Sequence, residues 1–414
     1  MKTVISILVL PVFLYSYTLN ELVDIAHQNR LVKSAEHSLK ASEKNYDSAK
    51  GSYLPTIEIG ASFENASEEN FATPKNSIKS YANLKYMLYD GGKKYDLYKQ
   101  LDSSIDSSKK NLEAIKNDIS LDVSRLYFEY LSLLSDKKAT VQEIEQLNAE
   151  LKRLNMFYKS GSATEDEVLK IDSRVKNSNV ALAEIELNIQ KVLHTLEYYT
   201  TKKIDTITED STIGYSDDRE KKLRADLKSL QYQADALKYS AESVRSSNYP
   251  TLYFNNRLTY NEYSYDDETL DTGMLIDTQN IASLNISWNI LDFGSTTDKY
   301  ESTYQEYLSN LSILEHQKAI ADVDYRLAKK SLEISKDKIE ATRSTLEAAS
   351  ATYELIKLRY QNGIVDNIAY LQALSEKFEA SRGYKRALYD YEVKKAELIY
   401  YSGKNIKEYL QWEN

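Results

Sequence analysis

The sequence contains no cysteine and few residues that break helices. Without cysteine the chain forms no disulfide, offers no thiolate ligand and lacks the N-terminal cysteine through which some exported proteins are lipidated. Only 4 proline and 11 glycine residues occur among 414. They are too few to separate many short elements, so the sequence predicts long, uninterrupted helices.

Long apolar stretches are also scarce. The longest, residues 4–15, follows Lys2 and is too short to span a bilayer. It is typical of a cleaved secretory signal rather than a buried core segment, and we place this signal peptide at residues 1–17. No later stretch reaches the ~20 apolar residues of a membrane-spanning helix. Any membrane passage of the mature chain is therefore expected to use strands.

Positive charge, histidine and methionine are in short supply. Acidic residues outnumber Lys and Arg by 63 to 53, which makes nucleic acid an unfavourable partner. The four histidines are scattered over separate segments, so we expect no metal and no cofactor, and four methionines are too few for a copper relay. No catalytic constellation emerges.

One arrangement is present twice. Three pairs of residues lie at the same offset, 292 − 90 = 202: Asp90 with Asp292, Tyr158 with Tyr360, and Gly161 with Gly363. The offset also relates two apolar rows, at 144–158 and 346–360, whose steps of three and four residues are typical of a coiled-coil seam. The sequence therefore contains a tandem duplication.

In each copy the sequence predicts a helix, two strands, a very long helix and a returning helix. The first copy, residues 18–201, has helices at 18–52, 93–158 and 165–200 and strands at about 56–64 and 80–89. The second copy, residues 219–402, has helices at 223–244, 296–360 and 366–401 and strands at about 251–260 and 281–291. Residues 202–218 form a polar linker, and residues 403–414 form a C-terminal tail.

Every predicted strand has one apolar and one polar face. The residues that we expect to face lipid are Leu84, Leu252, Leu284, Ile286 and Trp288. The polar faces carry Glu58, Lys85, Asn285 and Arg257, which are costly against hydrocarbon. About eight strands make the smallest barrel, and an open edge in lipid leaves backbone groups unpaired. Several copies must therefore share one barrel.

Two other interpretations remain open at this point. The face of an ordinary β-sandwich, packed on a core, shows a similar alternation. A soluble coiled-coil stalk explains the helices but not the strands.

The order of the motifs carries a resemblance to a known family. Residues 19–63 contain Tyr53-Leu54-Pro55-Thr56-Ile57, and residues 224–252 end in the related run from Asn248 to Leu252. Asp90-Gly91-Gly92, Asp292-Phe293-Gly294 and both Tyr-x-x-Gly tips complete the set. Together these motifs cover nearly the whole mature chain, which resembles the TolC-like outer-membrane efflux proteins.

The resemblance implies a mainly α fold with a membrane β-barrel portion. Four strands per protomer would join a shared twelve-stranded barrel of a homotrimer in the outer membrane of a Gram-negative bacterium. A long helical coiled-coil tunnel would continue it into the periplasm. The implied function is the exit duct of a tripartite efflux pump or a type I secretion system. The resemblance implies no catalytic activity, so we expect that the chain is not an enzyme. Its partners would be a periplasmic adaptor (membrane fusion) protein and an inner-membrane pump or ABC transporter. The alternative is a non-transport stalk protein of the cell envelope.

The helical tips are the candidate site for gating and adaptor docking. The residues that we expect there are Tyr158, Gly161, Glu167, Tyr360, Gly363 and Asp366. By the resemblance, a hydrogen bond from the Tyr360 hydroxyl to the Glu167 carboxylate would latch the two hairpins; the alternative is that both are solvated tip residues. The family's aperture acids are replaced here by Ala369 and Gln372, and Val365 stands where an arginine is frequent. An acidic ring is therefore not expected, and Asp366 is the candidate replacement.

Overall fold

The structure is a computed structural model that describes residues 16–209, 211–214 and 221–412. Residues 1–15 of the expected signal peptide, part of the linker and the last two residues lie outside the described ranges. The chain divides into two compact units. Unit 1 comprises Met1–Ser34, Leu112–Ala225 and Lys318–Asn414, and unit 2 comprises Ala35–Asn111 and Asp226–Gln317. Each unit therefore draws on both copies of the repeat.

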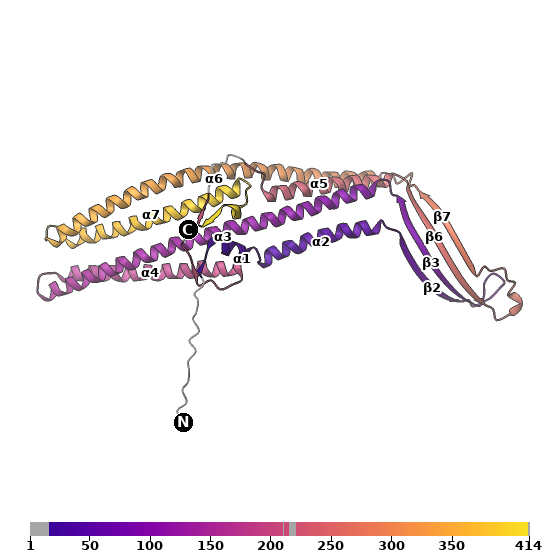
Figure 1. The fold of residues 1–414 in the computed structure, drawn as a ribbon, viewed down its shortest axis with the longest axis horizontal. Helices are drawn as coiled ribbons and strands as arrows, with labels where there is room; N and C mark the ends of the chain where they lie inside the picture. Colours follow the sequence, from indigo (N-terminus) through magenta and orange to yellow (C-terminus); the bar gives the residue numbers. More distant parts are fainter. Residues whose placement is uncertain (1–15, 210, 215–220, 413–414) are drawn as a thin grey trace, which may run out of the picture. The chain divides into compact units, whose positions relative to one another are not determined.

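Long helices make up most of the described chain (Figure 1). They are α1 (Leu19–Ala26), α2 (Arg30–Ser52), α3 (Lys93–Lys159), α4 (Glu165–Thr200), α5 (Ala225–Arg245), α6 (Ser295–Gln361) and α7 (Asn367–Tyr401). At ~1.5 Å rise per residue, α3 and α6 are each about 100 Å long, which confirms the prediction from the scarcity of glycine and proline. None of the described helices is both long and apolar enough to cross a membrane.

The first predicted helix is interrupted, so its prediction as one helix over 18–52 is wrong. The α1 helix ends at Ala26 and α2 begins at Arg30. The side chain of Asn29 accepts a hydrogen bond from the Val32 N–H at 3.0 Å and so caps a new helix start. Asparagine favours this local bond over continuation of a helix.

Unit 2 contains the four predicted strands in one antiparallel sheet. They are β2 (Thr56–Asn65), β3 (Asn76–Tyr89), β6 (Thr251–Ser264) and β7 (Thr278–Ser287), in the order β2-β3-β6-β7. Among the described residues, β2 and β7 each pair on one side only. The β7 strand ends at Ser287, before the predicted position 291, so Trp288 lies just past it.

The strand register brings the apolar faces together. Leu84 lies opposite Ile57, and on the other hairpin Leu252 lies opposite Ile286. On the other face, the Tyr81 hydroxyl donates to Glu58 at 3.0 Å, and the Arg257 guanidinium lies 4.2 Å from the centre of the Tyr81 ring. Pairing therefore extends the alternation of single strands into one apolar and one polar face of the whole sheet.

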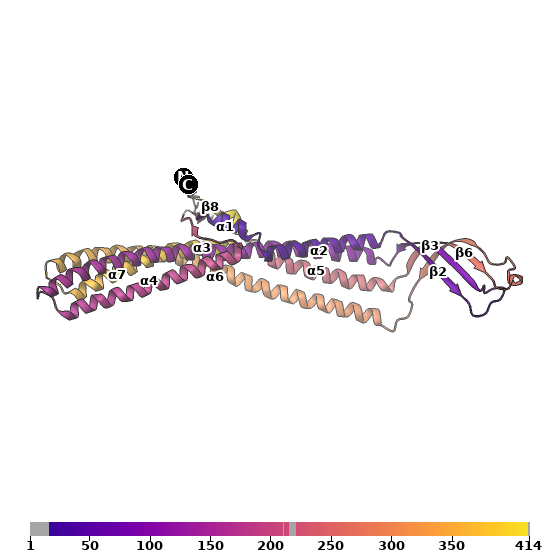
Figure 2. The ribbon, with the colours of Figure 1, turned by 90° about the horizontal axis from the view of Figure 1, so that it is seen from below.

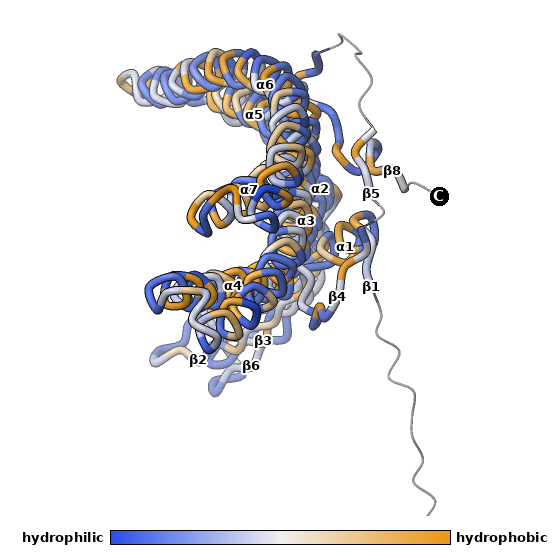
Figure 3. Tube along the Cα trace, turned by 90° about the vertical axis from the view of Figure 1, so that its left-hand side faces the viewer, coloured by the Kyte–Doolittle hydropathy of each residue, from blue (hydrophilic) through white to orange (hydrophobic). Residues whose placement is uncertain are grey.

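Unit 1 also contains short strands that the sequence did not predict. The parallel pair is β1 (Ser16–Tyr17) with β4 (Thr206–Ile207), and the antiparallel pair is β5 (Ser211–Ile213) with β8 (Leu410–Trp412). They lie with α1 beside the long helices (Figure 3). The segment expected as a polar linker contributes β4 and β5, and the C-terminal tail contributes β8. Tyr17 also belongs to this folded layer, although it falls within the expected signal segment.

The core of this layer explains its order. Leu19, Leu22 and Val23 of α1 are fully buried in one cluster with Tyr127 and Phe128 of α3. The Tyr127 hydroxyl donates to the Thr208 carbonyl at 2.7 Å. Apolar burial thus holds the short strands to unit 1, since pairs of two or three residues supply little stability alone.

The helical hairpins of unit 1, α3 with α4 and α6 with α7, lie side by side (Figures 1 and 2). The α3 and α7 helices lie between α4 and α6. Towards the tips a second core forms from Leu147 and Leu154 of α3, Ile171 of α4 and Tyr353 of α6 with Leu374 of α7. Leu147 and Leu154 belong to the apolar row predicted from the sequence. The predicted seam is therefore a packing contact between the hairpins.

Candidate functional site: the helical tips

Both hairpins turn through the same backbone geometry. Gly161 has φ 76° and Gly363 has φ 73°, the left-handed region that favours glycine. In each turn the residue after the glycine donates its N–H back across the turn, from Ser162 to the Phe157 carbonyl at 2.8 Å and from Ile364 to Arg359 at 2.9 Å. These bonds close the ends of α3 and α6. The two glycines are therefore required by the turns.

Carboxylates start the returning helices. Thr164 and Glu167 form a capping box, in which the Glu167 carboxylate accepts the Thr164 N–H at 2.9 Å. Asp366 caps α7 by accepting the Ala369 N–H at 2.9 Å. Both acids thus serve local helix starts within the described chain.

Tyr360 makes the contact between the hairpins, with a different partner from the one predicted. Its hydroxyl donates to Glu150 of α3 at 2.8 Å. The predicted bond to Glu167 is wrong, because the Glu167 carboxylate is held in the capping box while Glu150 faces α6. The latch between the hairpins exists, but its acceptor lies within α3.

The Arg153 cation and a second aromatic ring, that of Tyr370, lie against this bond. Arg153 donates to Glu150 at 2.8 Å and lies 4.6 Å from the centre of the Tyr360 ring. The Tyr370 ring of α7 stacks on Tyr360 at 4.8 Å with an interplanar angle of 16°. Burial and the hydrogen bond to Glu150 raise the pKa of Tyr360 to about 12. The Tyr360 phenol is therefore neutral and remains a donor at physiological pH.

Glu150 is the last of three buried acids spaced by seven residues along α3. Glu143 accepts a hydrogen bond from Arg382 of α7 at 3.0 Å, and Asp136 accepts one from Arg386 at 2.9 Å. Burial raises the pKa of Asp136, against the opposing effect of its bond to Arg386. Positions seven residues apart recur on one helix face, so one face of α3 carries polar bonds to the second hairpin along its length.

Most of this cluster was not predicted from the sequence. Glu150, Arg153 and Tyr370 were not singled out, although the seven-residue spacing of the acids was a usable signal. Of the predicted tip residues, the structure brings Tyr360 into the cluster. Tyr158 is exposed, and Glu167 and Asp366 cap their own helices. A role of these residues in gating or in docking a partner stays a prediction.

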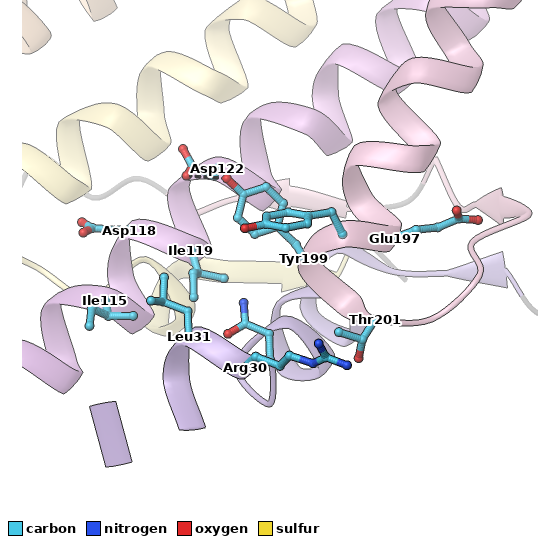
Figure 4. A pocket seen from close by; sticks show the side chains of 11 residues that line it. Arg30, Leu31, Ile115, Asp118, Ile119, Asp122, Glu197, Tyr199 and Thr201 are labelled. Atoms are coloured by element: carbon cyan, nitrogen blue, oxygen red, sulfur yellow. Dashed lines mark hydrogen bonds between the residues drawn. The ribbon is translucent and has the colours of Figure 1, made fainter. Parts of the chain in front are cut away.

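A cavity of about 480 Å³ lies where α1 meets α2 (Figure 4). Its lining includes Arg30 and Leu31 of α2, Asp118 and Asp122 of α3, and Tyr198 and Tyr199 of α4. The Tyr199 hydroxyl donates to Asp122 at 3.0 Å. Burial, together with this bond, raises the pKa of Tyr199 to about 12. No group of His, Cys, Asp and Glu among the described residues could hold a metal ion.

The chain matches the model of the outer membrane efflux proteins over residues 22–200 and 218–404. It belongs to the outer membrane efflux protein family. The match thus falls in two ranges, one in each half of the chain. A family of efflux proteins fits the expectation that the chain is not an enzyme, and it replaces the stalk interpretation. A comparison with curated protein sequences finds no match.

Solved structures share the fold at low sequence identity. The outer membrane protein VceC from Vibrio cholerae is 17% identical with a TM-score of 0.81, over 94% of this chain and 96% of that one. The Campylobacter jejuni CmeC outer membrane channel is 18% identical with a TM-score of 0.82, over 96% and 87%. The Neisseria gonorrhoeae MtrE outer membrane channel, in its open state, is 15% identical with a TM-score of 0.77, over 94% and 89%. The TolC-like fold is thus established over nearly the whole chain.

Proposed function

We propose that three copies of this chain form an exit duct across the outer membrane. Twelve strands close one barrel, and the helices continue it as a tunnel in the periplasm. The observation that carries the proposal is the sheet, which has one apolar face, one polar face and two edges that are unpaired within the described chain. Lipid suits the apolar face and water suits the polar one. An edge left open in lipid costs several kcal/mol per backbone group, so the edges must pair between copies.

The outer helices of unit 1 support the same assembly. Ile320, Leu327 and Ile334 are exposed on α6 at seven-residue spacing. The α4 helix exposes its own apolar residues, Val180 and Leu187. Such rows are the surfaces through which helices pack as coiled coils. In a closed ring, α6 of one copy lies against α4 of the next.

The tips are the proposed gate and docking site. The Tyr360–Glu150 bond joins α6 to α3, so parting the hairpins at this level requires breaking it. Tyr158, Gly161, Gly363 and Asp366 lie at the exposed ends, where an adaptor and an inner-membrane pump or ABC transporter would bind. Both a tripartite efflux pump and a type I secretion system present such partners. Crosslinking in cells, followed by identification of the attached adaptor, distinguishes the two systems.

Substitution of the turn glycines tests the function. Gly161→Val and Gly363→Val place a β-branched residue at positive φ, so the tips distort and export is expected to be lost. The matched control is Gly273→Val, because Gly273 has φ 65° and similarly open surroundings but lies in the loop between β6 and β7. Drug retention and secreted-protein titres are measured for each variant, with the trimer level as a control. Unimpaired export in both tip variants would contradict the placement of the gate.

A further inference from the structure

The polar face of the sheet carries more positive than negative charge. The strand register places five charged side chains on this face: Glu58, Glu64, Lys79, Lys85 and Arg257. Lys79 forms an ion pair with Glu64 at 2.5 Å, and Glu58 accepts a hydrogen bond from the Tyr81 hydroxyl. Lys85 and Arg257 are exposed, and no ion pair joins either of them to another described residue. Two cations of this face are therefore left without a charged partner in the described chain.

Lys85 and Arg257 belong to two neighbouring residue pairs on β3 and β6. Lys85 lies opposite Asn255, and Asn83 lies opposite Arg257. The two cations are thus diagonal neighbours, about 7–8 Å apart at their Cα atoms, and the two amides occupy the other diagonal. The Asn83 Oδ1 atom is buried and accepts no hydrogen bond from a described residue, so it uses none of the Arg257 donors. We call these four residues the β3–β6 cluster.

Aromatic rings position both cations. Gly60 lies opposite Tyr81, and a Cβ on Gly60 would lie 2.6 Å from the Tyr81 ring. Glycine at position 60 therefore lets this ring lie against β2. The Arg257 guanidinium lies 4.2 Å from the centre of the Tyr81 ring, and the Lys85 Nζ lies 5.1 Å from the centre of the Tyr253 ring. A ring face attracts a cation without neutralising its charge, so the N–H groups of both cations stay available to an acceptor.

The donors of the β3–β6 cluster suit an anion. Guanidinium, ammonium and amide groups together offer N–H donors, which bind carboxylate, sulfonate and phosphate oxygens. The surrounding protein has the opposite charge. Acidic residues outnumber Lys and Arg by 63 to 53 over the chain, and the loop at 265–277 contains acidic residues and neither Lys nor Arg. The cluster is therefore a local basic site in an acidic protein.

We propose that the β3–β6 cluster is an anion subsite on the inner wall of the duct, and that the duct favours cargo bearing carboxylate, sulfonate or phosphate groups. This inference rests on the proposed duct and assigns a charge class to its cargo. Rings of Lys and Arg are the elements by which pores select anions, and copies of the chain around one lumen would form such a ring. At about 10 Å in water, one unit charge changes the local concentration of a monovalent ion roughly twofold.

The absence of cysteine allows the local potential to be measured with a single thiol. Ser283→Cys places this thiol on the polar face, because Ser283 lies opposite Asn255. Both cations of the cluster are then within about 10 Å of it along the sheet. The full-length protein in outer membranes is treated with anionic sulfonatoethyl methanethiosulfonate or cationic trimethylammonioethyl methanethiosulfonate. The two rates give an anion-to-cation ratio, which is normalised to that of 2-mercaptoethanol.

The normalised ratio is expected to exceed one at about 0.01 M salt, where the Debye length is about 30 Å. Lys85→Gln and Arg257→Gln should each lower it about fourfold, because each reagent changes about twofold in opposite directions. In about 1 M salt the ratio should approach one. The matched control is Lys79→Gln combined with Glu64→Gln, which removes an ion pair from the same face without changing its net charge. This control should leave the ratio unchanged.

The outcomes separate the anion subsite from the duct. A ratio at or below one, or a ratio that neither Lys85→Gln nor Arg257→Gln lowers, would overturn the subsite and leave the duct intact. A thiol at position 283 that reacts with neither reagent would overturn the water-filled duct itself. Leu284→Cys lies on the apolar face, and the duct predicts that it stays unreactive. Trimer mass is measured for every variant, and the single substitutions suffice for the test.

Discussion

The contact between the two helical hairpins within the chain differs in chemistry from the outer helix faces that the chain leaves exposed. Between the hairpins, buried Glu143 and Asp136 meet Arg382 and Arg386 in addition to the apolar core of the seam. The outer helices of unit 1, α4 and α6, instead expose apolar rows, such as Ile320 and Leu327 on α6. Buried charge pairs are directional, so they can fix one alignment during folding, although they add little net stability. Apolar surface is non-directional and drives association in proportion to its area.

The turns that follow β3 and β7 show a similar difference at one pair of equivalent positions. Gly91 and Phe293 are related by 293 − 91 = 202 and both have positive φ, 77° and 54°. A Cβ on Gly91 would lie 2.4 Å from the Ser246 carbonyl oxygen, so the turn after β3 admits only glycine at this position. Phe293, at the open edge, is 90% exposed. Close packing thus restricts the turn after β3 to glycine, while the turn after β7 retains a large, exposed apolar side chain.

Breaking a buried pair between the hairpins has the largest expected effect. Arg382→Met leaves Glu143 buried without its 3.0 Å partner, with only Arg174 nearby at 3.8 Å. We expect a loss of roughly 3–5 kcal/mol in the free energy of unfolding. Thermal unfolding in detergent measures it. Arg382→Met combined with Glu143→Leu is the control and should recover most of the loss. A double variant as unstable as the single one would contradict the role of the unpaired charge.

Placing charge on the apolar face of the sheet has the next largest effect. Leu284→Arg or Ile286→Arg should cost about 2–4 kcal/mol if these residues meet lipid near the middle of the bilayer. Ser283→Arg and Asn285→Arg lie on the polar face and should be tolerated. Assembly into outer membranes measures both. Equal loss on the two faces would indicate a sheet buried on both sides and a different fold.

Removing the Tyr360 hydroxyl has an intermediate effect at the tips. Tyr360→Phe leaves the Glu150 carboxylate without this donor, at a cost of about 1.5–3 kcal/mol. Arg153 remains in place, which favours the lower figure. Tyr158→Phe is the control, because Tyr158 is exposed. Faster proteolysis at the tips in Tyr360→Phe alone is the expected outcome, and equal rates in both variants would contradict the latch.

The raised pKa of Tyr360 gives the latch a pH dependence. Its folded value of about 12 exceeds the ordinary 10.0, so the folded state retains the phenol proton longer than the unfolded state does. The stability from the neutral phenol is fully present below pH 10 and is lost as pH rises towards 12. Proteolysis at the tips should accelerate in this window, and Tyr360→Phe should remove that component. An unchanged profile in the variant would assign the effect to other tyrosines.

The smallest expected effect is at Phe293. Phe293→Gly relieves the positive φ and should stabilise a single chain by about 1 kcal/mol, whereas Gly91→Ala should destabilise it through contact with the Ser246 carbonyl. Thermal unfolding of both variants compares the two copies directly. Stabilisation by both substitutions, or by neither, would mean that the turns after β3 and β7 do not differ at this position.

The sequence predicted the long elements and failed at the short ones. Both 67-residue helices follow from the absence of breakers, and both strand faces follow from alternation. Strands of two or three residues, such as β1 and β5, are too short to leave a period. The partner of Tyr360 depends on how far the hairpins are displaced along each other, which no local pattern records. Nor does alternation reveal that α1 ends at Ala26 and that Asn29 caps the start of α2.

The mass of the full-length protein in detergent tests the central claim most directly. The account holds that each chain supplies four strands with two edges that only other copies can complete. Light scattering corrected for bound detergent should give the protein mass of three chains, in one monodisperse species. A monodisperse single chain would contradict the shared barrel and, with it, the exit duct.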